Sequence, residues 1–228
     1  MQEETKGSIR AALFDLDGTL IDTEGQYTEV WGRIGRKYHP EMPDFAYRIK
    51  GTTLQQILSR YFPDEEVQRT VVPELYAHEA RMKFDFYPGA VDFLRNLKAH
   101  GVKCAVVTSS NRRKMEAVRR QITDFDALFD RVFTAEDFHA SKPDPDCYLR
   151  AADAFGLAKE QCVVFEDAPN GLEAGRRSGI FTVGVATGLT PEEVAPLCDY
   201  VIGTYEGFTA EALEHIVHQK IRQKHGQE

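Results

Sequence analysis

The sequence predicts an α/β protein built on a doubly wound parallel sheet, with an α-helical segment inserted into it. Three observations support this prediction: short apolar runs recur along the chain, segments of helical spacing separate most of them, and one long stretch has helical patterns only. Strands that alternate with helices form parallel sheets whose two faces are covered by helices. The 228 residues, 42% of them hydrophobic, suffice for one core and an insertion.

Six short apolar runs are the predicted strands. The first, Ala11 to Phe14, stops at Asp15, as expected for a buried strand that places a carboxylate at its carboxyl end. The other five are Val102–Thr108, Arg131–Thr134, Cys162–Phe165, Phe181–Val185 and Tyr200–Ile202.

Three helices between these strands are predicted from their spacing and from a glycine that follows each one. Glycine is favoured just past a helix because it adopts the left-handed conformation in which many helices end. The segments Gly89–His100, Asp146–Phe155 and Asn170–Ser178 are followed by Gly101, Gly156 and Gly179.

The stretch from about Thr23 to Phe86 shows helical patterns and no convincing strand. Pro73 is expected to kink or split its last helix, because proline lacks the amide hydrogen that a helix interior needs. We therefore predict a core domain of residues 8–22 and 87–228 and an inserted helical domain of residues 23–86, with a hinge at Tyr87-Pro88-Gly89. The predicted helices of the insertion are Gln26–Lys37, Thr53–Phe62 and Asp64–Phe84.

Charge and composition limit the partners that we expect. The net charge of -8 and the pI near 5.4 argue against nucleic acids and anionic membranes, which need a basic surface. No apolar run is long enough to span a bilayer, and the first ten residues lack a signal-peptide core. The four cysteines form no Cys-x-x-Cys pair, so we expect buried free thiols and a reducing, cytoplasmic location.

Two carboxylates, Asp15 and Asp17, directly follow the first predicted strand, and Gly18 lets the chain turn sharply after them. This arrangement can bind a hard cation. Aspartate is just as common in simple turns, so this pair alone does not decide between a turn and a site.

Polar residues also follow the second strand and precede a later helix. Thr108, Ser109 and Asn111 offer donors that could hold phosphate oxygens, although such residues also cap helices. Lys142 precedes Pro143, which favours an extended backbone. Its ammonium could meet a phosphate as a point charge, or it could simply be solvated.

A second acidic pair, Glu166 and Asp167, ends another predicted strand. Parallel strands place their carboxyl ends at one edge of the sheet, where open α/β sheets bind ligands, so both acidic pairs should converge there. Four acids at one edge repel one another unless a cation neutralises them. The sequence therefore predicts a site for Mg²⁺, which prefers oxygen ligands.

These four blocks, in this order, resemble the four signature motifs of the haloacid dehalogenase superfamily, and the likeness covers nearly the whole chain. The blocks read FDLDGTLIDTE (14–24), VVTSSN (106–111), SKPDPD (141–146) and FEDAPNG (165–171). The resemblance implies a Rossmann-like core. The insertion is similar to the helical cap of the branch that contains β-phosphoglucomutases, phosphoglycolate phosphatases and pseudouridine-5'-phosphatase-like enzymes.

The resemblance also implies a function: an Mg²⁺-dependent phosphatase that hydrolyses a small sugar, polyol or nucleoside phosphate through an aspartyl-phosphate. Asp15 would be the nucleophile and Asp17 the acid and base, while Thr108 and Lys142 would stabilise the transferring charge. The implied metal ligands are Asp15, Glu166, Asp167 and Asp17, the last through its backbone carbonyl. Ser109, Asn111, Lys50 and Gly51 are the candidate phosphate and substrate contacts, although Lys50 could equally be solvated cap surface.

Two departures from the mutase branch favour hydrolysis. Residues 25–28 contain no histidine, and no arginine matches the mutase cap arginine after Lys50-Gly51. A phosphosugar mutase of the β-phosphoglucomutase type is nevertheless the alternative activity, and a non-catalytic phosphate-binding module is a third, disfavoured because every catalytic position is filled. The expected partner is a small phosphorylated metabolite, and the expected assembly is a monomer or weak dimer.

Overall fold

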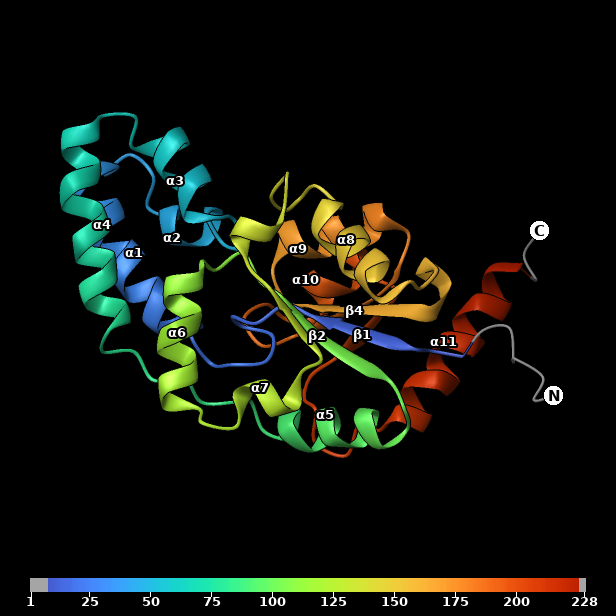
Figure 1. Cartoon of the computed structure of the whole chain (residues 1–228). Coiled ribbons are helices and arrows are strands. Elements are labelled where there is room, and N and C mark those ends of the chain that lie inside the picture. The colour runs from blue at the N-terminus through green and yellow to red at the C-terminus, as the bar shows by residue number, and fades with distance from the viewer. Residues whose placement is uncertain (1–7, 226–228) are drawn as a thin grey trace.

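One of the two central strands of the sheet is β1 (Ala11–Phe14), which precedes the first acidic pair (Figure 1). The computed structural model describes residues 8–225. All strand pairs are parallel, and the strand order is β3-β2-β1-β4-β5-β6. The predicted doubly wound parallel sheet is thus confirmed, and its direction of winding reverses between β1 and β4. The other strands are β2 (Lys103–Val107), β3 (Arg131–Phe133), β4 (Cys162–Glu166), β5 (Phe181–Val185) and β6 (Tyr200–Ile202).

Alternate side chains of the central strands pack against helices on opposite faces. Phe14 and Phe165 stack with their ring centres 4.5 Å apart and belong to the larger core, under α5 (Ala90–Ala99), α6 (Arg112–Gln121), α7 (Phe125–Leu128) and α11 (Ala210–His225). Leu13 and Val164 belong to the core of the other face, under α8 (Asp146–Phe155) and α9 (Pro169–Ser178). Side chains alternate in this way because the period of a strand is two residues.

Short elements complete the connections: α10 (Pro191–Val194) and the 3-10 turns η1 (Ala135–Asp137), η2 (Lys159–Gln161) and η3 (Ala195–Leu197). Within residues 8–225, no helix combines the length and the apolar character that crossing a membrane requires.

Four helices follow β1 and form a cap at the edge of the sheet where the strands end (Figure 1). They are α1 (Glu24–Tyr38), α2 (Phe45–Arg48), α3 (Leu54–Tyr61) and α4 (Glu65–Glu79). Trp31, Phe45 and Phe62 belong to a core of their own. The inserted helical cap is confirmed, whereas the domain ranges 8–22 with 87–228 and 23–86 stay predictions, and residues 226–228 lie outside the described part of the chain.

The two chain crossings between cap and core lie side by side. The amide of Asp22 donates to the carbonyl of Asp85 at 2.9 Å, and the amide of Tyr87 donates to the carbonyl of Leu20, also at 2.9 Å. Gly89, at the predicted hinge, has a φ of +79°, and a Cβ there would lie 2.5 Å from the backbone of Glu206. Glycine is therefore required where the chain re-enters the core.

Pro73 was expected to kink or split the last helix of the insertion, and it does not split α4. The helix continues through it and ends at Glu79 rather than Phe84. Pro73 lies on the exposed side, where water can bond the carbonyl that the missing amide leaves free. Several helices were not predicted, α2 and α6 among them; in α6 only Met115 and Val118 are buried apolar residues, too few for a clear helical pattern.

Candidate active site

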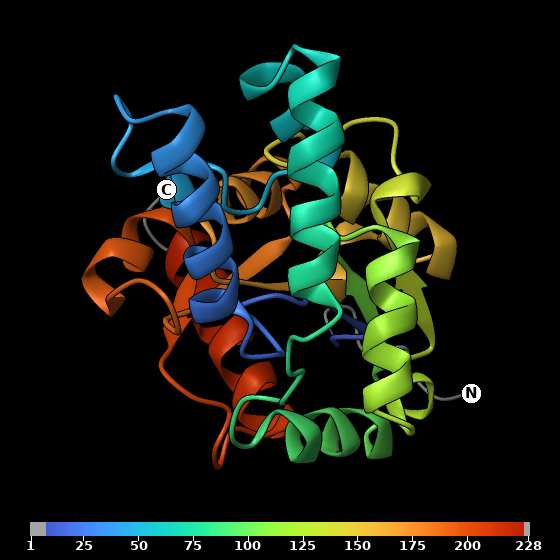
Figure 2. The same cartoon turned by 90° about the vertical axis from the view of Figure 1, so that its left-hand side faces the viewer.

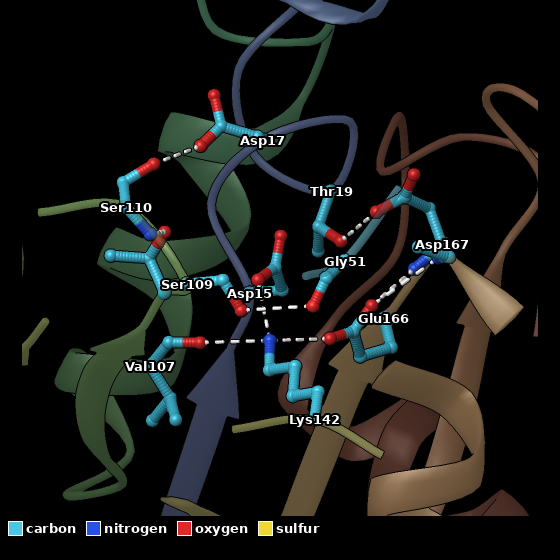
Figure 3. A network of polar contacts seen from close by, with 12 residues as sticks. Asp15, Asp17, Thr19, Gly51, Val107, Ser109, Ser110, Lys142, Glu166 and Asp167 are labelled. Carbon is cyan, nitrogen blue, oxygen red and sulfur yellow. Dashed lines mark hydrogen bonds and ion pairs between the residues drawn. The ribbon is translucent and has the colours of Figure 1, made fainter. Parts of the chain in front are cut away.

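Three carboxylates meet where β1 and β4 end (Figure 3). Asp15 follows β1, Glu166 is the last residue of β4, and Asp167 follows it. All three are buried, and one oxygen of each lies within 4.8 Å of the others. The predicted convergence of the two acidic pairs is therefore realised for these three side chains, at the switch point of the sheet where such folds bind ligands.

Lys142 lies beneath this acid cluster and is 1% exposed. Its Nζ donates to Asp15 Oδ1 and Glu166 Oε1, both at 2.6 Å, and to the carbonyl oxygen of Val107 at 3.1 Å. Burial alone would lower the pKa of Lys142, but the two carboxylates raise it above its ordinary value. The ammonium is thus fixed and fully bonded, because its three donors meet three acceptors.

Glu166 is held by bonds to both of its oxygens. Oε1 also accepts from Tyr148 Oη at 2.8 Å, and Oε2 accepts from the amides of Asp167 and Ala168 at 3.1 and 3.3 Å. Gly171 makes room for it, since a Cβ at that position would lie 1.8 Å from Oε1. Glu166 therefore anchors Lys142 in a fixed geometry.

The acid cluster holds more negative charge than Lys142 can neutralise. Burial, together with Glu166 and Asp17, raises the pKa of Asp15 to about 8, although Lys142 acts against this. Burial and the charges of Glu166 and Asp15 also hold the pKa of Asp167 well above its usual range. A buried set of oxygen ligands whose negative charge exceeds the single positive charge of Lys142 fits a hard divalent cation such as Mg²⁺.

The side chain of Asp17 lies outside the acid cluster and turns toward α6 (Figure 3). Oδ1 accepts from Thr23 Oγ1 at 2.6 Å and pairs with the ammonium of Lys114, while Oδ2 accepts from Ser110 Oγ at 2.8 Å. Burial would raise the pKa of Asp17, but Lys114 and the two hydroxyls lower it. Of the predicted metal ligands, Asp17 is thus the one whose carboxylate lies outside the acid cluster, which leaves its backbone carbonyl for that role.

Lys114 was missed by the sequence interpretation, although it is only 2% exposed and lies in the site. It belongs to the first turn of α6, which carries three cations in a row, Arg112, Arg113 and Lys114. Cations are unfavourable at the positively polarised start of a helix. This unfavourable run of three cations was the signal in the sequence that acidic or aromatic groups outside α6 contact these side chains.

The second motif lies beside Asp15 and contacts the cap. Thr108 is 1% exposed, and its Oγ1 accepts from the amide of Ser110 at 3.0 Å. Ser109 Oγ donates to the carbonyl of Gly51 at 3.0 Å, which joins core and cap. Asn111 caps α6 through Oδ1, which accepts from the amide of Lys114 at 2.9 Å, so the capping alternative holds for that oxygen.

A family model of haloacid dehalogenase-like hydrolases matches residues 9–179. The chain belongs to this family. The hydrolase is 34% identical over 195 residues to validoxylamine A 7'-phosphate phosphatase of Streptomyces hygroscopicus subsp. limoneus, a match that covers 82% of this chain and 90% of the relative. It is 33% identical over 179 residues to hexitol phosphatase A of Escherichia coli, covering 76% of this chain and 81% of the relative.

Among solved structures, the hydrolase resembles one described as a putative β-phosphoglucomutase from Bacteroides vulgatus. The TM-score is 0.75 at 25% identity, and the match covers 95% of this chain and 91% of that one. The fold, the helical cap and the family predicted from the motifs are thus confirmed together.

The cap of the hydrolase closes over the site. The carbonyl of Lys50 accepts from Asn170 Nδ2 at 2.9 Å, and Thr53 Oγ1 lies 3.3 Å from Ser141 Oγ. Lys50 Nζ pairs with Glu24, so it is not the solvated surface cation of the alternative interpretation. A cavity of about 120 Å³ lies between cap and core, and Asp15, Asp17, Lys50, Gly51, Thr108, Ser109 and Asn111 are among the residues that line it.

Proposed function

We propose that this chain, a phosphoric monoester hydrolase of the haloacid dehalogenase-like family, releases phosphate from a small phosphorylated sugar, polyol or nucleoside in an Mg²⁺-dependent reaction. The observation that carries the proposal is the placement of Asp15. Its carboxylate lines the closed cavity, Lys142 binds one of its oxygens, and Asp17 lines the same cavity.

In the first step Asp15 attacks phosphorus and forms an aspartyl-phosphate, while the bond to the leaving oxygen breaks. Lys142 engages Oδ1 of Asp15, which leaves Oδ2 for the attack. Asp17 gives a proton to the leaving oxygen, and it must carry that proton at this step although Lys114 and two hydroxyls lower its pKa. The leaving group therefore departs as a neutral alcohol.

In the second step a water molecule attacks the phosphorus and Asp17 takes up the proton of that water. The bond between phosphorus and Asp15 breaks, so that inorganic phosphate and the free carboxylate are formed. Thr23, Ser110 and Lys114 hold the carboxylate of Asp17 in one orientation for both transfers. Thr108 and Ser109 line the same cavity, and in this proposal their hydroxyl and amide donors bind the transferring oxygens.

Asp15, Asp167 and the backbone carbonyl of Asp17 would hold Mg²⁺, with Glu166 in support. When bound, the ion neutralises charge on the phosphoryl oxygens. Thr19 Oγ1 donates to Asp167 Oδ1 at 2.7 Å, which fixes that carboxylate for such a role. Gly18 allows this approach, because a Cβ there would lie 2.3 Å from Asp167 Oδ2.

Phosphorus NMR on a hexose 1-phosphate tests hydrolysis against mutase chemistry. With Mg²⁺ present, we expect the signal of inorganic phosphate to grow without added bisphosphate, and Asp15→Asn to lower the rate by several orders of magnitude. Circular dichroism would check that the variant stays folded. Growth of a hexose 6-phosphate signal with little free phosphate would instead favour the mutase.

The cytoplasmic location and the monomeric or weakly dimeric state rest on the sequence alone and stay predictions. A small phosphorylated metabolite as the partner of this chain also stays a prediction, which the two phosphatase relatives support.

A further inference from the structure

The wall of the cavity formed by two cap helices and one core helix holds polar side chains that the proposed chemistry leaves without a substrate contact. Tyr27 comes from α1, Glu79 from α4 and Lys114 from α6, and all three line the cavity. Figure 2 shows α4 between α1 and α6. A contact of 3.7 Å from the guanidinium of Arg113 to the ring centre of Tyr76 joins α6 to α4.

Glu79 occupies a position that is unfavourable for a carboxylate. It is the last residue of α4, where the helix dipole disfavours negative charge, and it is only 8% exposed. Burial raises its pKa, although Lys114 and Tyr27 act against this. Burying a carboxylate destabilises the fold unless hydrogen bonds or opposite charge compensate, so its presence beside the cavity needs a reason other than packing.

Only one of the two carboxylate oxygens of Glu79 is held by a hydrogen bond from another side chain. Tyr27 Oη donates to its Oε1 at 2.9 Å, and among the described residues no side chain donates a hydrogen bond to Oε2. A carboxylate oxygen accepts about two hydrogen bonds. Oε2 therefore retains acceptor capacity at the wall of the cavity.

A polar strip connects this carboxylate to the proposed acid and base. Lys114 Nζ lies 4.4 Å from the ring centre of Tyr27 and pairs with Asp17. Trp31, Ile57 and Leu75 line the same cavity with apolar surface. A leaving group that receives its proton from Asp17 would thus meet donors and acceptors along one side and apolar surface elsewhere.

Both cations of the lining are already paired, Lys50 with Glu24 and Lys114 with Asp17, and Glu79 lies on the same wall. A second phosphate or a carboxylate on the leaving group would thus find no free cation and would meet Glu79, while an ammonium would meet Lys50 and Lys114. The lining therefore suits a leaving group without charge.

We propose that Glu79 determines specificity by accepting hydrogen bonds, through Oε2, from the hydroxyl groups of a neutral, polyhydroxylated leaving group. Tyr27 is a positioning residue that fixes Oε1. The inference rests on the phosphatase function proposed above and narrows its substrates to sugar and polyol phosphates.

The test compares kcat/KM for two esters of equal carbon number, a hexitol 6-phosphate and n-hexyl phosphate, with Mg²⁺ present. The wild-type protein is expected to prefer the hexitol ester. Glu79→Gln keeps the shape but weakens the acceptor, and it should lower the ratio of the two kcat/KM values about tenfold or more. Glu74→Gln is the matched control, because Glu74 lies on the same helix but pairs with Arg33 outside the cavity; its ratio should equal that of the wild type.

Tyr27→Phe provides a second variant if Glu79→Gln does not fold, and it should lower the same ratio by a smaller factor. If the ratio of the two kcat/KM values is unchanged in Glu79→Gln, the inference is overturned. If Glu79→Gln does not fold, an unchanged ratio in Tyr27→Phe overturns it. So does a wild-type preference for an alkyl phosphate that ends in an ammonium or a carboxylate over the hexitol ester. Absence of hydrolysis of every ester, p-nitrophenyl phosphate included, would instead overturn the proposed function itself.

Discussion

The pKa values of Asp15 and Asp167 indicate that the site has too little positive charge for its carboxylates. Both carboxylates are buried, and both have raised pKa values because burial and neighbouring acids disfavour ionisation. Without metal, we therefore expect the folded protein to retain protons that the unfolded chain releases between about pH 4 and pH 8. A bound cation would replace those protons.

This gives a prediction for stability as a function of pH. Without metal, the folded state binds more protons than the unfolded state in that range, so the free energy of unfolding should fall as the pH rises. Saturating Mg²⁺ should remove most of the loss, because the ion favours the ionised carboxylates. Thermal melts in chelator and in Mg²⁺ would measure this, and the Tm difference should be larger at about pH 8 than at about pH 6. An equal Tm difference at the two pH values would count against a metal at these carboxylates.

The sequence predicted the residues of the site that follow strands and missed those that depend on the packing of helices. Asp15, Glu166 and Asp167 could be predicted to converge because parallel strands end at one edge. Glu79 and Lys114 could not, because their meeting depends on how α4 and α6 pack, and no local pattern fixes that arrangement.

At the scale of elements, the strands and the glycine-terminated helices were predictable because each has a local signal. Gly156 and Gly179 end α8 and α9 in the left-handed conformation, as the sequence indicated. The four-residue helix α2 has no such signal, since so short a segment shows no period. Its place is fixed by contact with α1.

That contact gives a prediction about α1. A Cβ at Gly35 would lie 2.9 Å from the ring of Phe45 on α2, whereas a Cβ at Gly32 would meet only Arg36 Nη1 at 3.4 Å. Gly35→Ala should therefore destabilise the protein by about 1–3 kcal/mol through overpacking. Gly32→Ala should stabilise it by about 0.5–1 kcal/mol, since alanine is the better helix former.

Urea denaturation of both variants would measure these changes in the free energy of unfolding. The two glycines lie one turn apart on the same helix, so Gly32→Ala serves as the control for helix propensity. Equal shifts for the two variants would mean that α1 and α2 are not packed at Gly35 as described.

At the scale of the whole molecule, the cap and the core are joined by few polar contacts at the closed site. Gly51, Lys50 and Thr53 on the cap each contact a core residue, and none of these contacts is an ion pair between cap and core. Such weak closure suits a lid that must open for substrate and close for reaction. We therefore expect the cavity between cap and core to admit a small metabolite and to exclude a folded phosphoprotein.

Removal of the cap should therefore separate recognition of the leaving group from the chemistry at Asp15. Residues 20–22 pair with residues 85–87, so a short flexible linker can replace residues 24–80, while Met82 and Phe84 remain for the core that they help to fill. We expect kcat/KM for a sugar or polyol phosphate to fall far more than kcat/KM for p-nitrophenyl phosphate. The reason is that p-nitrophenolate leaves without protonation, whereas an alcohol depends on the enclosed site for its proton and for exclusion of water. Both kcat/KM values are measured on one truncated protein, after a cooperative melt has confirmed that it is folded. Equal losses of kcat/KM for the two esters would show that the cap does not select the substrate.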